Sequence, residues 1–220
     1  MKVHCISETN SILNVFVAEL RDINIQKDPM RFRRNLERTG EILSYEMSKH
    51  LNFSNSNVET PLGINETPLI EDEVVICSIL RAGLPLHIGV LNYFDRAENA
   101  FISAYRKHEE GSDNFEIIIE YAACPDLTNK TLLIVDPMLA TGQSITLTYD
   151  ALLAFGEPKS CHIISVIGAQ QGVDYVNDNL PKASELWIGA IDDVLNSKGY
   201  ILPGLGDAGD LAFGPKCNHP

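Results

Sequence analysis

One stretch of the sequence decides the fold: TLLIVDPMLATGQS, which runs from Thr131 to Ser144. Its first five residues are apolar or β-branched, as in a buried strand, and an acid, Asp136, follows them. A loop of small residues comes next, and residues 144–155 then have the length of a helix that Gly156 closes. A strand that leads through a short loop into a helix predicts one strand–helix unit of an α/β fold.

The same pattern continues on both sides of this stretch. Short runs rich in β-branched residues predict further strands at residues 74–79, 100–105, 162–167 and 185–190. Helices are expected at residues 84–93 and 170–180, the second closed by Pro181. Because the strands lack the strict alternation of a half-exposed sheet, we expect a parallel sheet covered on both faces by helices.

The N-terminal part predicts a long helix. Asp28 can cap it and Pro29 suits its first position, while apolar residues recur at helical spacing to about residue 51. A polar stretch, residues 52–73, separates this helix from the first strand. We expect one domain over residues 1–220, built with a helical extension (1–72), an extended arm over the site or against another subunit (107–130) and an irregular tail (191–220).

Charge and cysteine content exclude several classes of protein. The 17 Lys and Arg against 30 Asp and Glu give a formal charge of −13, whereas binding duplex DNA requires a basic face. The scattered cysteines, without a CxxC pair, predict buried free thiols in a reducing compartment: Cys5, Cys77, Cys124, Cys161 and Cys217. The N-terminus lacks the features of a signal peptide, and no apolar run approaches the roughly 18 residues of a membrane span. We expect a cytoplasmic protein that binds neither nucleic acid nor membrane.

The loop after residue 135 is the candidate site. Its backbone N–H groups and the hydroxyls of Thr141 and Ser144 can point at a phosphate, at the positive end of the following helix. Asp136 then stands where it can accept hydrogen bonds from sugar hydroxyls. The alternative is an ordinary strand-to-helix turn in which Asp136 is only a cap.

Three motifs together resemble a known family. VDPMLATGQS resembles the 5-phosphoribosyl-1-diphosphate (PRPP) signature of the uracil phosphoribosyltransferases, which usually ends ATGGS. SILRAGLP (78–85) with AYR (104–106), and GYILPGLGDAGDLAFG (199–214), occur in the family's order. The resemblance implies the type I phosphoribosyltransferase fold and transfer of phosphoribose from PRPP to N1 of uracil, giving UMP and diphosphate in pyrimidine salvage.

The same resemblance implies roles for individual residues. The catalytic group would be Arg81, Arg106, Asp136 and Asp207. PRPP would contact those four residues together with Pro137, Met138, Leu139, Ala140, Thr141, Gly142, Gln143 and Ser144. Uracil would contact Ile201, Gly206, Asp207 and Ala208. Mg²⁺ would be bound mainly through PRPP without a direct protein ligand, and a homodimer or higher oligomer is implied.

Three features have competing interpretations. The alternative for Arg81 or Arg106 taken alone is a surface ion pair, but their positions after the first and second strands of the sheet favour the ligand role. Gln143 replaces a glycine of the family's motif, and if that position needs a positive φ, glutamine costs on the order of 1–2 kcal/mol. Residues 204–209 also match the dinucleotide fingerprint G-x-G-x-x-G, but the eleven residues after Gly209 leave no room for the helix, strand and acid it needs.

Outside the motifs, ordinary structural roles are expected. His162 and Trp187 lie in apolar runs, which predicts core positions for both. The six histidines contain no sequence-local pair at metal-ligand spacing. The one basic cluster is expected to be solvated surface, with a GTP effector site as the alternative: Arg31, Arg33, Arg34 and Arg38.

Two other functions stay open beside uracil phosphoribosyl transfer. One is a non-catalytic PRPP- or nucleotide-sensing protein on the same fold, which Gln143 favours. The other is phosphoribosyl transfer to a different nucleobase, against which Ile201 and the GDA segment argue.

Overall fold

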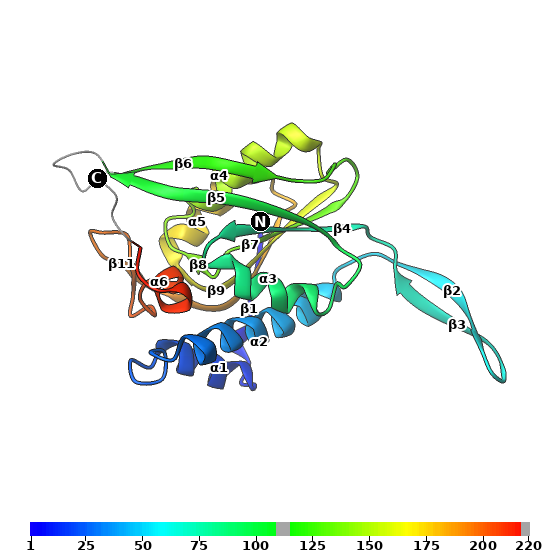
Figure 1. Cartoon of the computed structure of the whole chain (residues 1–220). Coiled ribbons are helices and arrows are strands. Elements are labelled where there is room, and N and C mark those ends of the chain that lie inside the picture. The colour runs from blue at the N-terminus through cyan, green and yellow to red at the C-terminus, as the bar shows by residue number, and fades with distance from the viewer. Residues whose placement is uncertain (109–114, 217–220) are drawn as a thin grey trace.

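The computed structural model describes the backbone of residues 1–108 and 115–216, and their side chains except those of 104–119. Its centre is an eight-stranded sheet in the order β1-β10-β9-β7-β4-β5-β6, with β8 paired beside β9 (Figure 1). The strands are β1 (Lys2–Cys5), β4 (Val74–Leu80), β5 (Glu98–His108), β6 (Phe115–Ala123), β7 (Thr131–Val135), β8 (Met138–Leu139), β9 (Ser160–Ala169) and β10 (Glu185–Asp192). Within the described residues, β5–β6 is the one antiparallel pair of this sheet.

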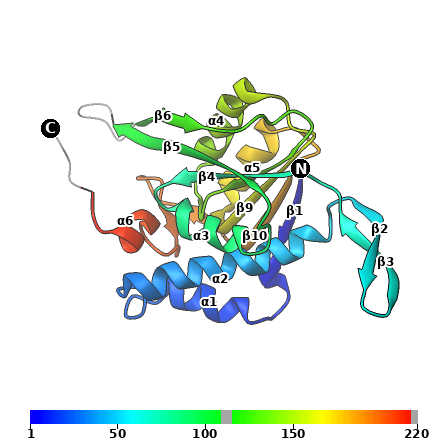
Figure 2. The same cartoon turned by 45° about the vertical axis from the view of Figure 1, so that its right-hand side comes forward.

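Helices cover both faces of the sheet, as the sequence predicts (Figure 2). They are α1 (Leu13–Arg21), α2 (Pro29–Ser48), α3 (Gly83–Leu91), α4 (Gln143–Leu152), α5 (Gln170–Asn179) and α6 (Ala208–Phe213). Short 3-10 turns follow β1 and α4: η1 (Ile6–Glu8) and η2 (Leu153–Phe155). The predicted strands and helices are confirmed to within a few residues at their ends.

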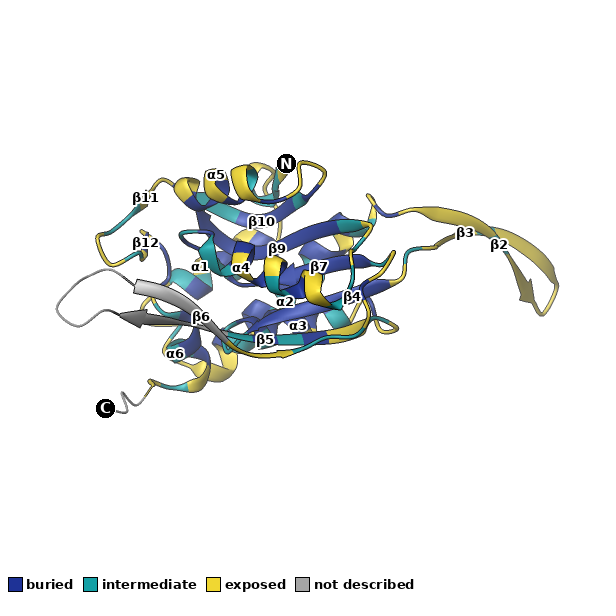
Figure 3. Ribbon diagram, turned by 90° about the horizontal axis from the view of Figure 1, so that it is seen from above, coloured by how far each residue is buried: buried dark blue, intermediate teal, exposed yellow. Residues whose placement is uncertain are grey.

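Strand β7 shows why the sheet is buried on both sides. Leu133 and Val135 pack into the core beneath α1, α2 and α3, while Leu132 and Ile134 pack into the core beneath α4 and α5. Successive side chains of a strand point to opposite faces, so a strand covered on both faces must be apolar throughout. Figure 3 shows the central strands largely buried.

Helix α2 begins as predicted. Asp28 accepts hydrogen bonds from the backbone N–H groups of Met30 and Arg31, and Pro29 is the first helical residue. Its packing on α3 depends on glycines, since a Cβ on Gly89 would lie 2.0 Å from the carbonyl oxygen of Glu37. Helix α2 therefore lies close against α3, and it also contacts α6.

The terminal segments correct the sequence prediction. Residues 1–72 are more than a helical extension, because β1 adds a parallel edge strand beside β10 and the polar stretch forms a hairpin, β2 (Phe53–Thr60) and β3 (Gly63–Ile70). The tail from residue 191 is also partly ordered into β11 (Val194–Leu195), β12 (Ile201–Leu202) and α6. Tertiary pairing produces these elements, since the four residues of β1 and the polar hairpin lack a strong local pattern.

The arm expected at residues 107–130 is a hairpin formed by β5 and β6. It begins earlier than predicted, because β5 continues to His108 instead of ending at residue 105. Residues 109–114 lie outside the described part of the chain.

Buried side chains confirm the core positions predicted for His162 and Trp187. Trp187 is buried, and its Nε1–H donates to Nδ1 of buried His162 at 3.3 Å. Burial lowers the pKa of His162 and raises the pKa of the Cys124 and Cys161 thiols to about 11 and about 12. The described cysteines are free; Cys77 and Cys161 are buried as predicted, whereas Cys5 and Cys124 are only partly buried. Cys217 lies outside the described residues. Within residues 1–108 and 115–216, no helix is both long and apolar enough to cross a membrane.

Candidate active site

The loop between β7 and α4 is fixed by hydrogen bonds to an aspartate side chain and to strand β9. Asp136 is buried and its Oδ1 accepts a hydrogen bond from the N–H of Met138 at 3.2 Å. The carbonyl oxygen of Pro137 accepts from the N–H groups of Val166 and Ile167, both at 3.1 Å. Strand β8 then pairs with β9, so the loop is attached to the sheet at both ends.

This loop encloses a small polar hollow of about 20 Å³. Its lining is Asp136, Met138, Leu139, Ala140, Thr141, Gly142, Ser144 and Ile145, which is most of the predicted PRPP loop. The first turn of α4, a helix of 10 residues, opens onto the same place. Free N–H groups and the helix dipole at such a terminus favour an anion such as a phosphate.

The glycine that this loop requires is Gly142. It has φ +80°, and a Cβ there would lie 2.9 Å from the carbonyl oxygen of Gly172 and 3.0 Å from side-chain atoms of Tyr175 and Val176. Gln143 is already the first residue of α4, and among the described residues Asn129 is the only non-glycine with positive φ. The glutamine therefore carries no backbone penalty, which answers the question left by the sequence.

Adjacent substitutions test this assignment. Gly142→Ala is expected to raise the KM for PRPP at least tenfold, because the left-handed conformation costs a side chain roughly 1–2 kcal/mol and the new Cβ displaces α5 from the loop. Gln143→Gly serves as the control and is expected to change KM less than threefold. Steady-state kinetics at saturating nucleobase measure both. A severe defect in Gln143→Gly with a normal Gly142→Ala would contradict the assignment.

Arg81 lies directly after β4, where the sequence places it. Its Nη2 donates to Oδ1 of Asp210 at 2.9 Å and to the carbonyl oxygen of Gly214 at 3.3 Å. Gly83 allows this turn to approach the β7 loop, since a Cβ there would lie 2.8 Å from the carbonyl oxygen of Val135. Arg81 thus connects the turn after β4 to α6, while Gly83 brings the same turn close to the end of β7.

Arg106 differs from its predicted position. It was expected just after a strand, but it lies inside β5, opposite Ile117 of β6 and three residues beyond Ser103, the last partner of β4. It still stands past the carboxyl end of the neighbouring parallel strand. Its side chain is outside the described part of the structure.

The predicted base-recognition segment forms a tight turn that leads into α6. Ile201 and Ala208 are buried, and Gly204 and Gly206 have φ of +59° and +93°. Asp207 caps α6 by accepting a hydrogen bond from the N–H of Asp210 at 3.0 Å. A two-residue strand and a six-residue helix are too short for a dinucleotide-binding unit, so that alternative is excluded by the structure as well.

Sequence reasoning missed a polar clamp beneath this segment. Arg21, at the end of α1, donates to both carboxylate oxygens of Asp192 at 2.7 and 2.8 Å and to the carbonyl oxygen of Gly204 at 3.0 Å. The N–H of Gly204 donates back to Asp192 at 3.1 Å, and Gln26 donates to the carbonyl oxygen of Leu205 at 3.1 Å. These partners are far apart in the chain, so no local pattern reveals them.

A polar hollow at the carboxyl end of a parallel strand, with the turn that bears Arg81 and a glycine-rich segment at the same end of the sheet, is the arrangement expected of a phosphoribosyltransferase. The family model described as uracil phosphoribosyltransferase matches residues 7–215. The chain belongs to the uracil phosphoribosyltransferase family, which is a family of pentosyltransferase enzymes.

Relatives of known name agree with this placement. The chain is 54% identical to the uracil phosphoribosyltransferase of Porphyromonas gingivalis, over 98% of this chain and 100% of that one. It is 40% identical to the enzyme of that name from Methanothermobacter thermautotrophicus, over 85% of each chain. A solved protein structure from Aquifex aeolicus superposes with a TM-score of 0.86 at 29% identity, covering 96% of this chain and 98% of that one.

Proposed function

We propose that this chain transfers the 5-phosphoribosyl group of PRPP to N1 of uracil, giving UMP and diphosphate in pyrimidine salvage. The observation that carries the proposal is that the hollow of the β7 loop, the turn that bears Arg81, and α6 with the segment before it lie at the same end of the sheet (Figure 1). These are the parts needed to bind a sugar phosphate, a diphosphate and a small planar base. Family membership supports the same substrates.

The proposed reaction is a displacement at the anomeric carbon of PRPP. N1 of uracil bonds to that carbon as its bond to the diphosphate oxygen breaks, and the N1 proton is released. Backbone N–H groups of residues 139–144 hold the 5-phosphate, and Asp136 accepts from ribose hydroxyls. Arg81 and Arg106 neutralise the departing diphosphate, while Ile201 and residues 206–208 position the base. Catalysis then depends on positioning and on charge stabilisation, without a covalent nucleophile.

Mg²⁺ is part of the proposal, bound mainly through PRPP. The fit is indirect: the hollow at the start of α4 favours an anion, and the oxygen-rich diphosphate of PRPP would supply the kind of ligand that a hard cation prefers. When bound, the ion would offset the negative charge of the diphosphate. A chain of net charge −13 has few positive side chains to do so itself. We expect PRPP binding in calorimetry to weaken at least tenfold when Mg²⁺ is chelated; equal affinity with and without the ion would contradict this.

A panel of bases tests the reaction itself. Purified protein with Mg²⁺ and PRPP is expected to form UMP from uracil, and at least a hundredfold less product from cytosine, hypoxanthine or orotate. A segment that requires specific hydrogen bonds from the base rejects bases lacking them. Chromatography of the nucleotides measures each product. Absence of UMP would favour the sensing alternative, which has lost its sequence support now that Gln143 is known to be helical.

A GTP effector at the α2 arginines is a further part of the proposal. Arg31 and Arg34 pair with Glu19 and Glu37 at 3.7 and 2.7 Å, and Arg38 lies 5.3 Å from the ring centre of Phe16. Arg33 supports the effector idea best, since it donates to the carbonyl oxygen of Ala212 in α6 at 2.6 Å and so links the cluster to the base segment. Initial rates that stay flat during a GTP titration would exclude it.

A homodimer or higher oligomer is also proposed. The hairpin of β2 and β3 extends away from the rest of the chain (Figure 1), and its exposed apolar side chains include Phe53, Leu62 and Ile64. Such side chains on an extended arm favour contact with a second copy. Light scattering is expected to give at least twice the chain mass, and less in Ile64→Lys. A monomer at micromolar concentration would contradict the proposal.

A further inference from the structure

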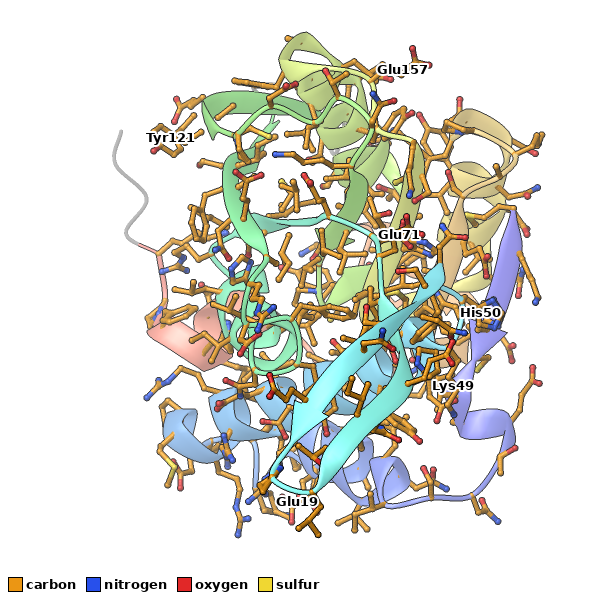
Figure 4. The ribbon with its side chains drawn as sticks, turned by 90° about the vertical axis from the view of Figure 1, so that its right-hand side faces the viewer. Glu19, Lys49, His50, Glu71, Tyr121 and Glu157 are labelled. Carbon is orange, nitrogen blue, oxygen red and sulfur yellow. The ribbon has the colours of Figure 1, made fainter. Side chains whose placement is uncertain are left out.

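Three potential metal ligands meet at the amino-terminal edge of the sheet, at the opposite ends of the strands from the candidate active site. His4 lies in β1, His50 follows α2, and Glu185 is the first residue of β10. Figure 4 views this edge, with His50 labelled beside β1. We propose that His4, His50 and Glu185 form a binding site for a transition-metal dication of the Zn²⁺ type.

The geometry of the donor atoms supports this site. Nε2 of His4 lies 2.6 Å from Oε2 of Glu185, and Nδ1 of His50 lies 3.3 Å from the same oxygen. All three donor atoms lie within 4.8 Å of one another. Metal–ligand bonds of about 2.0–2.2 Å in a tetrahedron separate the ligand atoms by about 3.3 Å, so small side-chain movements would accommodate an ion.

The kind of ligand indicates the kind of ion. Two imidazoles and one carboxylate suit Zn²⁺, Co²⁺ or Ni²⁺, whereas Mg²⁺ prefers an all-oxygen shell. The three side chains are 15%, 31% and 22% exposed in the order His4, His50, Glu185. They are therefore held by the protein on one side and open to solvent on the other, which leaves a fourth coordination position for water.

Trp187 preorganises the two imidazoles. The His4 ring stacks on it at 3.7 Å between ring centres with planes 4° apart, and His50 meets it edge-on at 4.8 Å and 75°. Trp187 is itself fixed, because it is buried and donates to His162. Ligands whose rings are locked by packing lose little freedom when an ion binds. The alternative role of the cluster, hydrogen bonding between the imidazoles and Glu185 alone, predicts no specific metal binding.

The site carries its own reporter, since Trp187 is the only tryptophan in the sequence. Full-length protein without a histidine tag, stripped of metal with a chelator, is titrated with Co²⁺. We expect saturable quenching of Trp187 fluorescence, one ion per chain by calorimetry, and recovery of the fluorescence when Zn²⁺ displaces Co²⁺. Excess Mg²⁺ is expected to leave the quenching unchanged.

Variants decide whether the quenching belongs to this site. His50→Ala and the shape-conserving Glu185→Gln are each expected to weaken Co²⁺ binding at least tenfold. Glu46→Gln is the matched control, because Glu46 pairs with Lys49 at the same end of α2 but is not one of the proposed ligands. The Co²⁺ affinity of this variant should equal that of the parent protein. Absence of quenching, or equal affinity in the parent and both ligand variants, would overturn the proposal. So would an anomalous Co²⁺ peak located away from these side chains.

Discussion

Arg81→Ala is expected to lower kcat/KM for the uracil reaction on the order of 10²- to 10³-fold, the usual effect of removing one donor that stabilises developing charge. The guanidinium belongs to the turn that follows β4 and contacts α6, and the backbone of that turn lies close to the end of β7, where the departing diphosphate is proposed to lie. A planar fork of donors suits phosphate oxygens, and this acidic chain has few cations to replace it. Steady-state kinetics with PRPP varied at fixed uracil measure the loss.

Asp210→Asn separates this role from a structural one. The substitution removes the ion pair that Arg81 makes at 2.9 Å but leaves the guanidinium in place. If Arg81 acts on diphosphate, Asp210→Asn should stay within about threefold of the parent, and Arg81→Lys should fall between the parent and Arg81→Ala. An equal loss in Asp210→Asn and Arg81→Ala would mean that the ion pair, rather than substrate contact, matters.

Arg21→Ala is expected to lower the free energy of unfolding by about 3 kcal/mol and to raise the KM for uracil more than the KM for PRPP. Asp192 is buried, and removing its bidentate partner leaves an uncompensated charge, which typically costs about 3–5 kcal/mol. Arg21 also holds the carbonyl oxygen of Gly204, so the base segment loses its support. Urea unfolding followed by Trp187 fluorescence, together with kinetics, measures both effects.

A double-mutant cycle tests the clamp. Asp192→Asn added to Arg21→Ala should restore part of the lost stability, because the stranded charge is removed. Arg34→Ala is the surface control and should change the free energy of unfolding little. Arg34 forms a solvent-accessible ion pair with Glu37, three residues further along the same helix, and such pairs contribute little to stability. Additive losses in the cycle, or equal increases in both KM values, would contradict the assignment of Arg21 as a positioning residue for the base segment.

Local patterns predict most of the main sheet and the centre of the site. Strand β7, its acid and its small-residue loop are adjacent in sequence, so residues 131–144 could be placed on a strand, a loop and a helix before any contact was known. The capped start of α2 follows from Asp28 and Pro29 in the same way. Arg106 could not be placed correctly, because whether β5 ends or continues depends on its pairing with β6.

By itself, the sequence determined the α/β class, the order of the central strands and helices, and the family, because hydrophobic periodicity, capping and motif spacing are properties of neighbouring residues. Only the tertiary structure decided what distant residues do together. It paired Arg21 with Asp192, gathered His4, His50 and Glu185 on Trp187, added β1 to the sheet edge and assigned the positive φ to Gly142 rather than Gln143. Those outcomes depend on which segments the parallel sheet brings side by side, and that arrangement leaves no periodic trace in the sequence.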